Sequence, residues 1–133
     1  MKRKYEILQR STTYERVIGV DSEEREGIMK LLEGNSKYIK KFRYVVDKIL
    51  EQPNMYFDDY KKIKTSHRET ITEIRLFPNG DNCRIYCKEQ LIDGTLHCVI
   101  LAVLLEKKKS QKINKVIQQI INRIKNYEYE LRS

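Results

Sequence analysis

The chain has 133 residues, and its 27 Lys and Arg against 19 Asp and Glu give a formal net charge of +8. This length fits one domain, and 40% hydrophobic residues with only 5 Gly and 2 Pro allow a modest core and exclude a low-complexity or collagen-like chain. The longest apolar run, Cys98 to Leu105, is far below the roughly 20 residues that span a bilayer, and no apolar signal region follows Met1. We therefore expect a cytoplasmic protein with no membrane partner.

The positive charge is distributed unevenly along the chain. Residues 1–36 hold seven basic and seven acidic residues, whereas residues 107–133 hold eight basic and two acidic residues. An asymmetric basic field favours a polyanionic partner such as RNA, DNA or an acidic protein segment. The alternative is an ordinary lysine-rich surface that is only solvated.

The N-terminal half is predicted to be rich in helix. Residues 4–10 and 14–20 are short, β-prone stretches, and a capping box of Asp21 and Glu24 predicts a helix over residues 22–33. A second helix is predicted to begin at Ser36 and to end at Pro53. Its apolar residues recur at helical spacing: Ile39, Phe42, Val46, Ile49 and Leu50.

The C-terminal half is predicted to contain a small antiparallel sheet. Residues 53–69 have a weak apolar rhythm and are interpreted as a loop, and residues 70–89 are predicted to form a hairpin around Asn79-Gly80. A continuous apolar run predicts a central strand near residues 97–105, and residues 110–129 have the apolar spacing of a long amphipathic helix. The expected fold class is α+β.

The hairpin places two arginines opposite each other. A turn centred on Asn79-Gly80 pairs Arg75 with Arg84 and Glu73 with Tyr86 on one polar face. Opposed like charges are unfavourable by up to about 1 kcal/mol, and guanidinium groups bind phosphate through two parallel hydrogen bonds. A phosphate between the two arginines is one explanation, and neutralisation by Glu73 is the other.

The cysteines and histidines do not predict a metal site. Cys83, Cys87 and Cys98 are interpreted as reduced core thiols, because adjacent strand residues such as His97 and Cys98 point to opposite faces and cannot converge on one ion. His97 is interpreted as structural, and His67, within the basic loop, as a candidate acid or base. No metal or cofactor is expected.

The order of motifs in residues 60–130 resembles the RelE/HigB superfamily of bacterial toxins, including its phage Gp49-like branch. The motifs that carry the resemblance are Ile71-Thr72-Glu73-Ile74-Arg75, Cys83-Arg84-Ile85-Tyr86, Val99-Ile100-Leu101 and Lys107-Lys108-Lys109-Ser110-Gln111-Lys112. The resemblance implies a single RelE/HigB-like domain over residues 1–133, with residues 1–35 as an N-terminal extension. Ile113-Asn114 stands where many members of the superfamily have a Tyr.

The resemblance implies a ribosome-dependent mRNA endoribonuclease, or mRNA interferase, that is held inactive by an acidic antitoxin protein. Cleavage of this kind needs no metal, because basic groups can move the protons and stabilise the extra charge on the phosphate. The expected catalytic residues are Arg84, Arg75, Lys108, Lys109 and His67, and the expected RNA-binding residues are Lys61, Lys62, Lys64, Arg68, Tyr86, Lys107 and Lys112. The alternative is a non-catalytic RNA- or DNA-binding protein that has lost cleavage.

Overall fold

The computed structural model describes residues 1–65, 70–76, 82–106 and 115–132. Its elements in chain order are β1 (Lys2–Arg10), β2 (Arg16–Asp21), α1 (Arg25–Glu33), α2 (Ser36–Glu51), β3 (Tyr60–Thr65), β4 (Thr70–Leu76), β5 (Cys83–Ile92), β6 (Leu96–Leu105), α3 (Lys115–Lys125) and β7 (Glu128–Leu131). Within the described residues, no helix is both long and apolar enough to cross a membrane.

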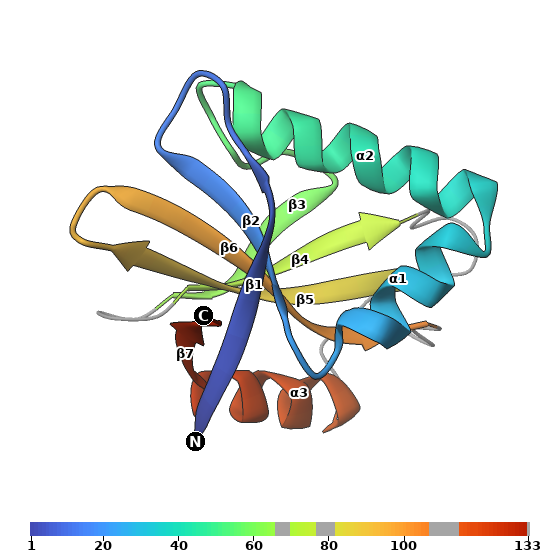
Figure 1. Cartoon of the computed structure of the whole chain (residues 1–133). Coiled ribbons are helices and arrows are strands. Elements are labelled where there is room, and N and C mark those ends of the chain that lie inside the picture. The colour runs from blue at the N-terminus through green and yellow to red at the C-terminus, as the bar shows by residue number, and fades with distance from the viewer. Residues whose placement is uncertain (66–69, 77–81, 107–114, 133) are drawn as a thin grey trace.

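The strands form one mixed sheet of seven strands in the order β3-β4-β5-β6-β2-β1-β7. The pairs β2–β6 and β1–β7 are parallel, and the other neighbouring strands are antiparallel. Figure 1 shows α1 and α2 on one side of this sheet and α3 on the other. The fold therefore has three layers, with the sheet in the middle.

Each face of the sheet has its own hydrophobic core. On the α1/α2 side, Ile28, Leu32 and Ile49 pack on strand residues such as Ile18 and Ile85. On the α3 side, the helix contributes four buried isoleucines, which are Ile117, Ile120, Ile121 and Ile124. Because both faces are covered, the central strands β5 and β6 are buried along most of their length, as strands between two layers must be.

The predicted RelE-like layout is wrong. The described residues form a seven-stranded mixed sheet with three short helices, rather than a small antiparallel sheet beside long helices. Residues 1–35, predicted to be an extension, supply β1, β2 and α1, and β2 lies between β6 and β1 inside the sheet. Eight of the nine residues of β1 are not classed as buried. Because several of them are charged, the sequence of β1 gives only a weak strand signal.

The predicted long C-terminal helix is also wrong. The described helix is α3, and it is followed by β7, which pairs in parallel with β1. Tyr129 of β7 donates a hydrogen bond to buried Asp21 at 2.7 Å, and Arg3 of β1 donates to the same carboxylate at 2.6 Å. This buried contact between distant parts of the chain favours a strand where the apolar spacing alone favoured a helix. It also uses Asp21, which was predicted to cap a helix: α1 begins at Arg25 without a side-chain cap.

The segment predicted as a loop over residues 53–69 contains β3. Its residue Tyr60 is fully buried, while Lys61 and Lys62 are exposed, because β3 is the last strand at its end of the sheet. A strand with lysines on this edge has too few apolar residues to give a clear period-two pattern.

Candidate functional site

The two arginines of the hairpin face each other in the predicted register. Arg75 pairs with Arg84 and Glu73 pairs with Tyr86 across β4 and β5. The Oε1 atom of Glu73 lies 2.9 Å from Nε of Arg75 and 4.0 Å from Nε of Arg84. The carboxylate of Glu73 therefore supplies negative charge next to both guanidinium groups.

Burial limits what this arginine pair can contact. The side chain of Arg84 is 0% exposed, that of Arg75 is 25% exposed, and Tyr86 is fully buried in the core on the α3 side. Burial lowers the pKa of Arg84, Glu73 partly offsets this, and Arg75 adds to the lowering. A phosphate could reach Arg84, and a base could stack on Tyr86, only if the neighbouring groups moved. The proposed roles of these residues stay predictions.

Several residues predicted for the site lie outside the described part of the chain. They are His67, Arg68, Lys107, Lys108, Lys109 and Lys112. The neighbouring Ile113 and Asn114 also lie outside the described residues. Of the other predicted RNA-binding residues, Lys61, Lys62 and Lys64 lie on β3, with Lys61 and Lys62 exposed and Lys64 partly buried.

A cluster of hydrogen-bonding side chains lies on the opposite face of the sheet, beyond the C-terminal end of α2. We call it the Glu89 cluster, and it consists of Tyr56, Tyr60, Glu89 and His97. Glu89 of β5 accepts hydrogen bonds from the hydroxyl groups of Tyr56, at 2.7 Å, and of Tyr60. Nε2 of His97, on β6, lies 2.8 Å from Oε1 of the same carboxylate.

The Glu89 carboxylate stays ionised in this buried position. Burial by itself raises the pKa of Glu89, but hydrogen bonds from His97, Tyr60 and Tyr56 outweigh burial and lower it below its ordinary value. The pKa of Tyr60 is raised well above its ordinary value, first by burial and then by the charge of Glu89. The two tyrosines therefore remain neutral hydrogen-bond donors to a charged acceptor.

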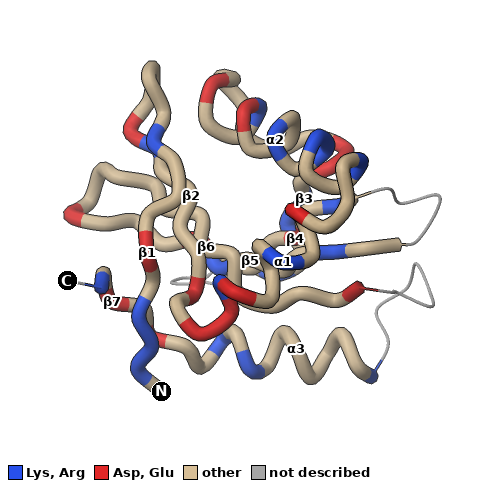
Figure 2. The backbone as a smooth tube through the Cα atoms, turned by 45° about the vertical axis from the view of Figure 1, so that its right-hand side comes forward, with Lys and Arg blue, Asp and Glu red and all other residues tan. Residues whose placement is uncertain are grey.

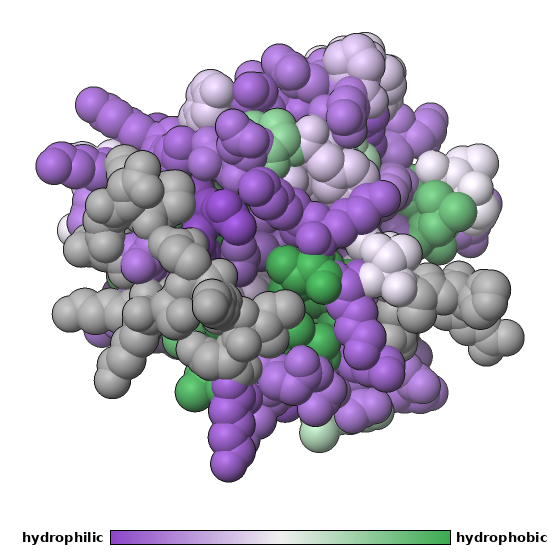
Figure 3. Space-filling view, turned by 180° about the vertical axis from the view of Figure 1, so that it is seen from behind, coloured by the Kyte–Doolittle hydropathy of each residue, from purple (hydrophilic) through white to green (hydrophobic). Residues whose placement is uncertain are grey.

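A second group of residues forms a basic and aromatic surface, which we call the α2–β3 surface. It is defined by Lys41, Tyr44, Lys48, Phe57 and Lys62; Lys61 pairs with Glu73 and lies on the other face of the sheet. Residues 37–64, which contain it, hold eight basic and four acidic residues, and Figure 2 shows basic positions along α2 and on β3. The described part of the face seen in Figure 3 is also largely hydrophilic.

Lysines sit on the aromatic rings of this surface. The ammonium group of Lys48 lies 4.4 Å from the ring centre of Phe57 and 5.3 Å from that of Tyr44, and Lys41 lies 5.4 Å from Tyr44. Tyr44 is 50% exposed and meets Phe57 edge to face at 6.4 Å. These cation–π contacts hold flat rings and positive charges side by side at the surface.

Tyr56 connects the α2–β3 surface to the Glu89 cluster. The ammonium group of Lys62 lies 4.4 Å from the ring centre of Tyr56, and the hydroxyl group of the same ring donates to Glu89. The length of one tyrosine side chain therefore separates the exposed lysine from the hydrogen-bonded carboxylate.

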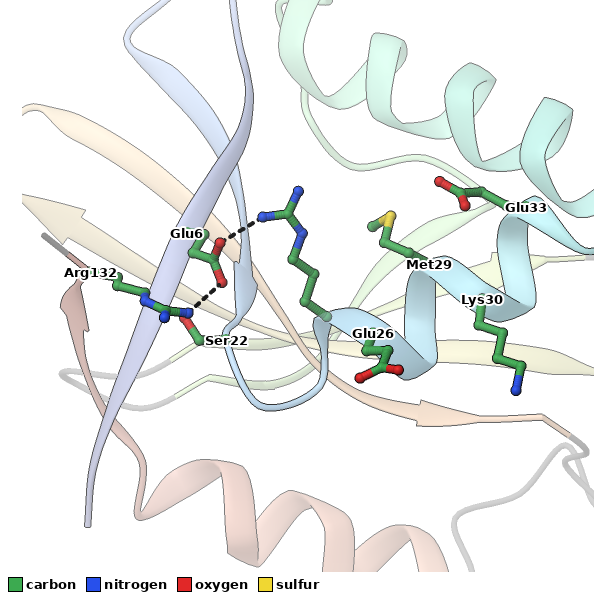
Figure 4. Close-up of a pocket in the computed structure, with 8 residues that line it drawn as sticks. Glu6, Ser22, Glu26, Met29, Lys30, Glu33 and Arg132 are labelled. Atoms are coloured by element: carbon green, nitrogen blue, oxygen red, sulfur yellow. Dashed lines mark hydrogen bonds and ion pairs between the residues drawn. The ribbon is translucent and has the colours of Figure 1, made fainter.

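A shallow groove of about 600 Å³ lies elsewhere, between α1 and the strand β1. It is lined by Glu6, Ser22, Arg25, Glu26, Met29, Lys30, Glu33 and Arg132. Arg25 and Arg132 both contact the carboxylate of Glu6, at 2.6 and 3.5 Å, as the dashed lines of Figure 4 mark. Three acidic and three basic side chains line the groove, so they neutralise one another and define no ligand charge.

The three cysteines are buried. Cys83 and Cys87 belong to the core on the α1/α2 side and Cys98 to the core on the α3 side. Burial raises the pKa of Cys98 to about 12. These thiols are core residues on two faces of the sheet, as the alternation of strand residues predicts.

The sequence analysis missed the Glu89 cluster because its members come from a connecting segment and three strands. His97 was interpreted as structural, and no motif joins it to Glu89 or Tyr56. One signal was available: if residues 83–92 and 96–105 form a hairpin, Glu89 and His97 lie on neighbouring strands with side chains on one face.

No protein-family model, curated protein or solved structure matches the chain.

Proposed function

We propose that this protein binds single-stranded RNA along the α2–β3 surface. The observation that carries the proposal is that lysines and partly exposed aromatic rings alternate there, with Lys41 and Lys48 on Tyr44 and Lys48 on Phe57. Lysines attract the phosphate backbone and release its counterions, and aromatic rings provide faces on which unpaired bases stack. An ordinary solvated lysine surface gives no reason for partly exposed aromatic rings such as that of Tyr44 to lie among the lysines.

The experiment compares two double charge reversals that change the net charge equally. One variant carries Lys48→Glu on α2 and Lys62→Glu on β3, and the control carries Lys115→Glu and Lys125→Glu, two exposed lysines of α3 on the other side of the sheet. Binding of a short unstructured fluorescent RNA is measured by anisotropy over a series of salt concentrations.

We expect the Lys48→Glu and Lys62→Glu variant to lose at least about tenfold in affinity, and the slope of log K against log salt to fall by about 1.4, since each phosphate contact on a single strand contributes about 0.7. Tyr44→Ala should weaken binding by about 1–3 kcal/mol through lost stacking, with the salt slope unchanged. Equal losses in the α3 control, or a wild-type protein that prefers duplex DNA, would contradict the proposal.

The ribosome-dependent mRNA cleavage implied by the family resemblance remains a second candidate. The observation in its favour is the facing pair Arg75 and Arg84, and the burial of Arg84 argues against it. Toe-printing of translated mRNA with the purified protein tests it: new 3′ ends inside codons support the mRNA interferase, and their absence contradicts it. An acidic antitoxin partner stays a prediction tied to this candidate.

A further inference from the structure

We propose that His97, oriented by Glu89, is a general base that cleaves the RNA held on the α2–β3 surface. This inference rests on the proposed RNA binding and adds a reaction to it. His97 would be the catalytic residue, and Glu89 and Tyr56 would be positioning residues.

The first argument is the geometry of the imidazole ring. A carboxylate can only accept hydrogen bonds, so Nε2 of His97, 2.8 Å from Oε1 of Glu89, carries the proton and the lone pair is on Nδ1. The side chain of Glu89 is 4% exposed, whereas that of His97 is 34% exposed. A fixed, buried carboxylate therefore orients a ring that solvent and ligands can still reach, as in the acid–base pairs of enzymes.

The second argument is the rigidity of the support. Glu89 is held by Tyr56 and Tyr60, and Tyr60 in turn accepts a hydrogen bond from Thr72 at 3.0 Å. These contacts fix the carboxylate on both oxygens before any ligand arrives. Such preorganisation is what a base needs if the ring is to stay aligned during proton transfer.

The third argument is the position beside positive charge. Tyr56 joins the cluster to Lys62, and Arg16 of β2 is the direct strand partner of His97. The guanidinium group of Arg16 donates to the carbonyl groups of Ile49, at 3.0 Å, and of Pro53, at 2.8 Å, and also to that of Gln52, at the end of α2. An RNA strand that crosses from Lys62 of β3 toward His97 would therefore pass between two cations, Lys62 and Arg16.

The reaction is an internal transesterification. Nδ1 of His97 takes the proton of a ribose 2′-hydroxyl, and the resulting 2′-oxygen forms a bond to the adjacent phosphorus. The bond from phosphorus to the 5′-oxygen breaks, and this oxygen leaves with a proton from a water molecule. The products are a 2′,3′-cyclic phosphate and a 5′-hydroxyl end, and the Glu89 carboxylate stabilises the imidazolium that forms.

The experiment measures binding and cleavage of the same fluorescent RNA in the presence of EDTA. We expect wild-type protein to generate 2′,3′-cyclic phosphate ends and to leave an RNA with 2′-deoxy sugars intact. His97→Ala and His97→Gln should both reduce the cleavage rate by about 100-fold or more with an affinity close to that of wild type, since general-base catalysis contributes about 10²–10⁴ in rate. Tyr56→Phe should give a smaller loss in rate, and Glu128→Gln, at an exposed glutamate of β7, should give none.

The outcomes separate the two proposals. If the wild-type protein does not bind the RNA, the proposed function is overturned. Binding without cleavage, cleavage that EDTA abolishes, or equal rates for wild type and both His97 variants would overturn the role of His97 and leave the binding proposal standing. Circular dichroism of each variant establishes that the fold is retained.

Discussion

At the scale of single residues, Glu89 is a point at which three segments of the chain meet. It is 6% exposed and contacts Tyr56, Tyr60 and His97, so three side chains from different segments depend on one carboxylate. A hydrogen bond to a charged group contributes about 1.5–3 kcal/mol, and removing one partner of a buried group leaves the others unsatisfied. Glu89 is therefore a structural centre whether or not the cluster is catalytic.

We predict that Glu89→Gln lowers the free energy of unfolding by about 2–3 kcal/mol at neutral pH, because the charged acceptor is replaced by an amide that can accept at only one atom. Urea denaturation followed by circular dichroism measures the change. Glu128→Gln, at an exposed position of β7, is the matched control and should change the free energy by less than about 0.5 kcal/mol. A loss of similar size in both variants would show that the buried hydrogen bonds of Glu89 contribute little.

The pH dependence follows from the lowered pKa of Glu89. Since the folded protein holds this carboxyl group ionised below its ordinary pKa of 4.5, the unfolded chain binds more protons in that range. The stability from Glu89 is present above pH 4.5 and is lost as the pH falls through the lower, folded value. Unfolding free energies measured between pH 7 and pH 3 should therefore fall less steeply for Glu89→Gln than for wild type.

At the scale of elements, the end of α3 is held by a lysine from the sheet. Lys88 of β5 is 6% exposed, and its ammonium group donates to the carbonyl of Tyr127 at 2.5 Å and to that of Lys125 at 3.4 Å. The last carbonyl groups of a helix lack partners within the helix, and the helix dipole favours a positive charge there. Lys88 therefore joins the sheet to the turn between α3 and β7.

We predict that Lys88→Met destabilises the protein by about 1–3 kcal/mol, because the carbonyl groups lose a charged donor while the aliphatic packing is kept. Lys125→Met, at an exposed position of α3, is the control and should change the free energy of unfolding by less than about 0.5 kcal/mol. Thermal and urea unfolding of both variants provide the measurement. If the control is as unstable as Lys88→Met, the loss comes from the helix and not from the sheet contact.

The hairpin of β4 and β5 shows what an element can reveal from sequence. Its register was predictable, because Asn79-Gly80 suits a tight turn and the strand alternation fixes the facing pairs. The burial of its polar face was not predictable: Tyr86 packs in one core with the isoleucines of α3, and Arg84 is fully buried. The alternation of the strands predicts the facing pairs, whereas the burial of Tyr86 depends on a helix more than twenty residues further along the chain.

At the scale of the whole molecule, the strand order was beyond sequence reasoning. The parallel pairs β2–β6 and β1–β7 join segments from opposite ends of the chain, and no local pattern encodes which distant strands become neighbours. The helices α1 and α2 were predictable because they depend on local spacing. The Glu89 cluster was not, because Tyr56 and His97, which both contact Glu89, lie far apart in the sequence.

The position of β3 at the end of the sheet order affects the tendency of the protein to aggregate in a concentrated solution. A border strand with free backbone groups can recruit a strand from a neighbouring molecule, and lysines at such a border keep copies of the chain apart by repulsion. Lys61 and Lys62 would therefore be retained by selection against aggregation as well as by any ligand. A neutral replacement would remove both effects together, whereas glutamate preserves the repulsion between copies and reverses only the attraction for a polyanion.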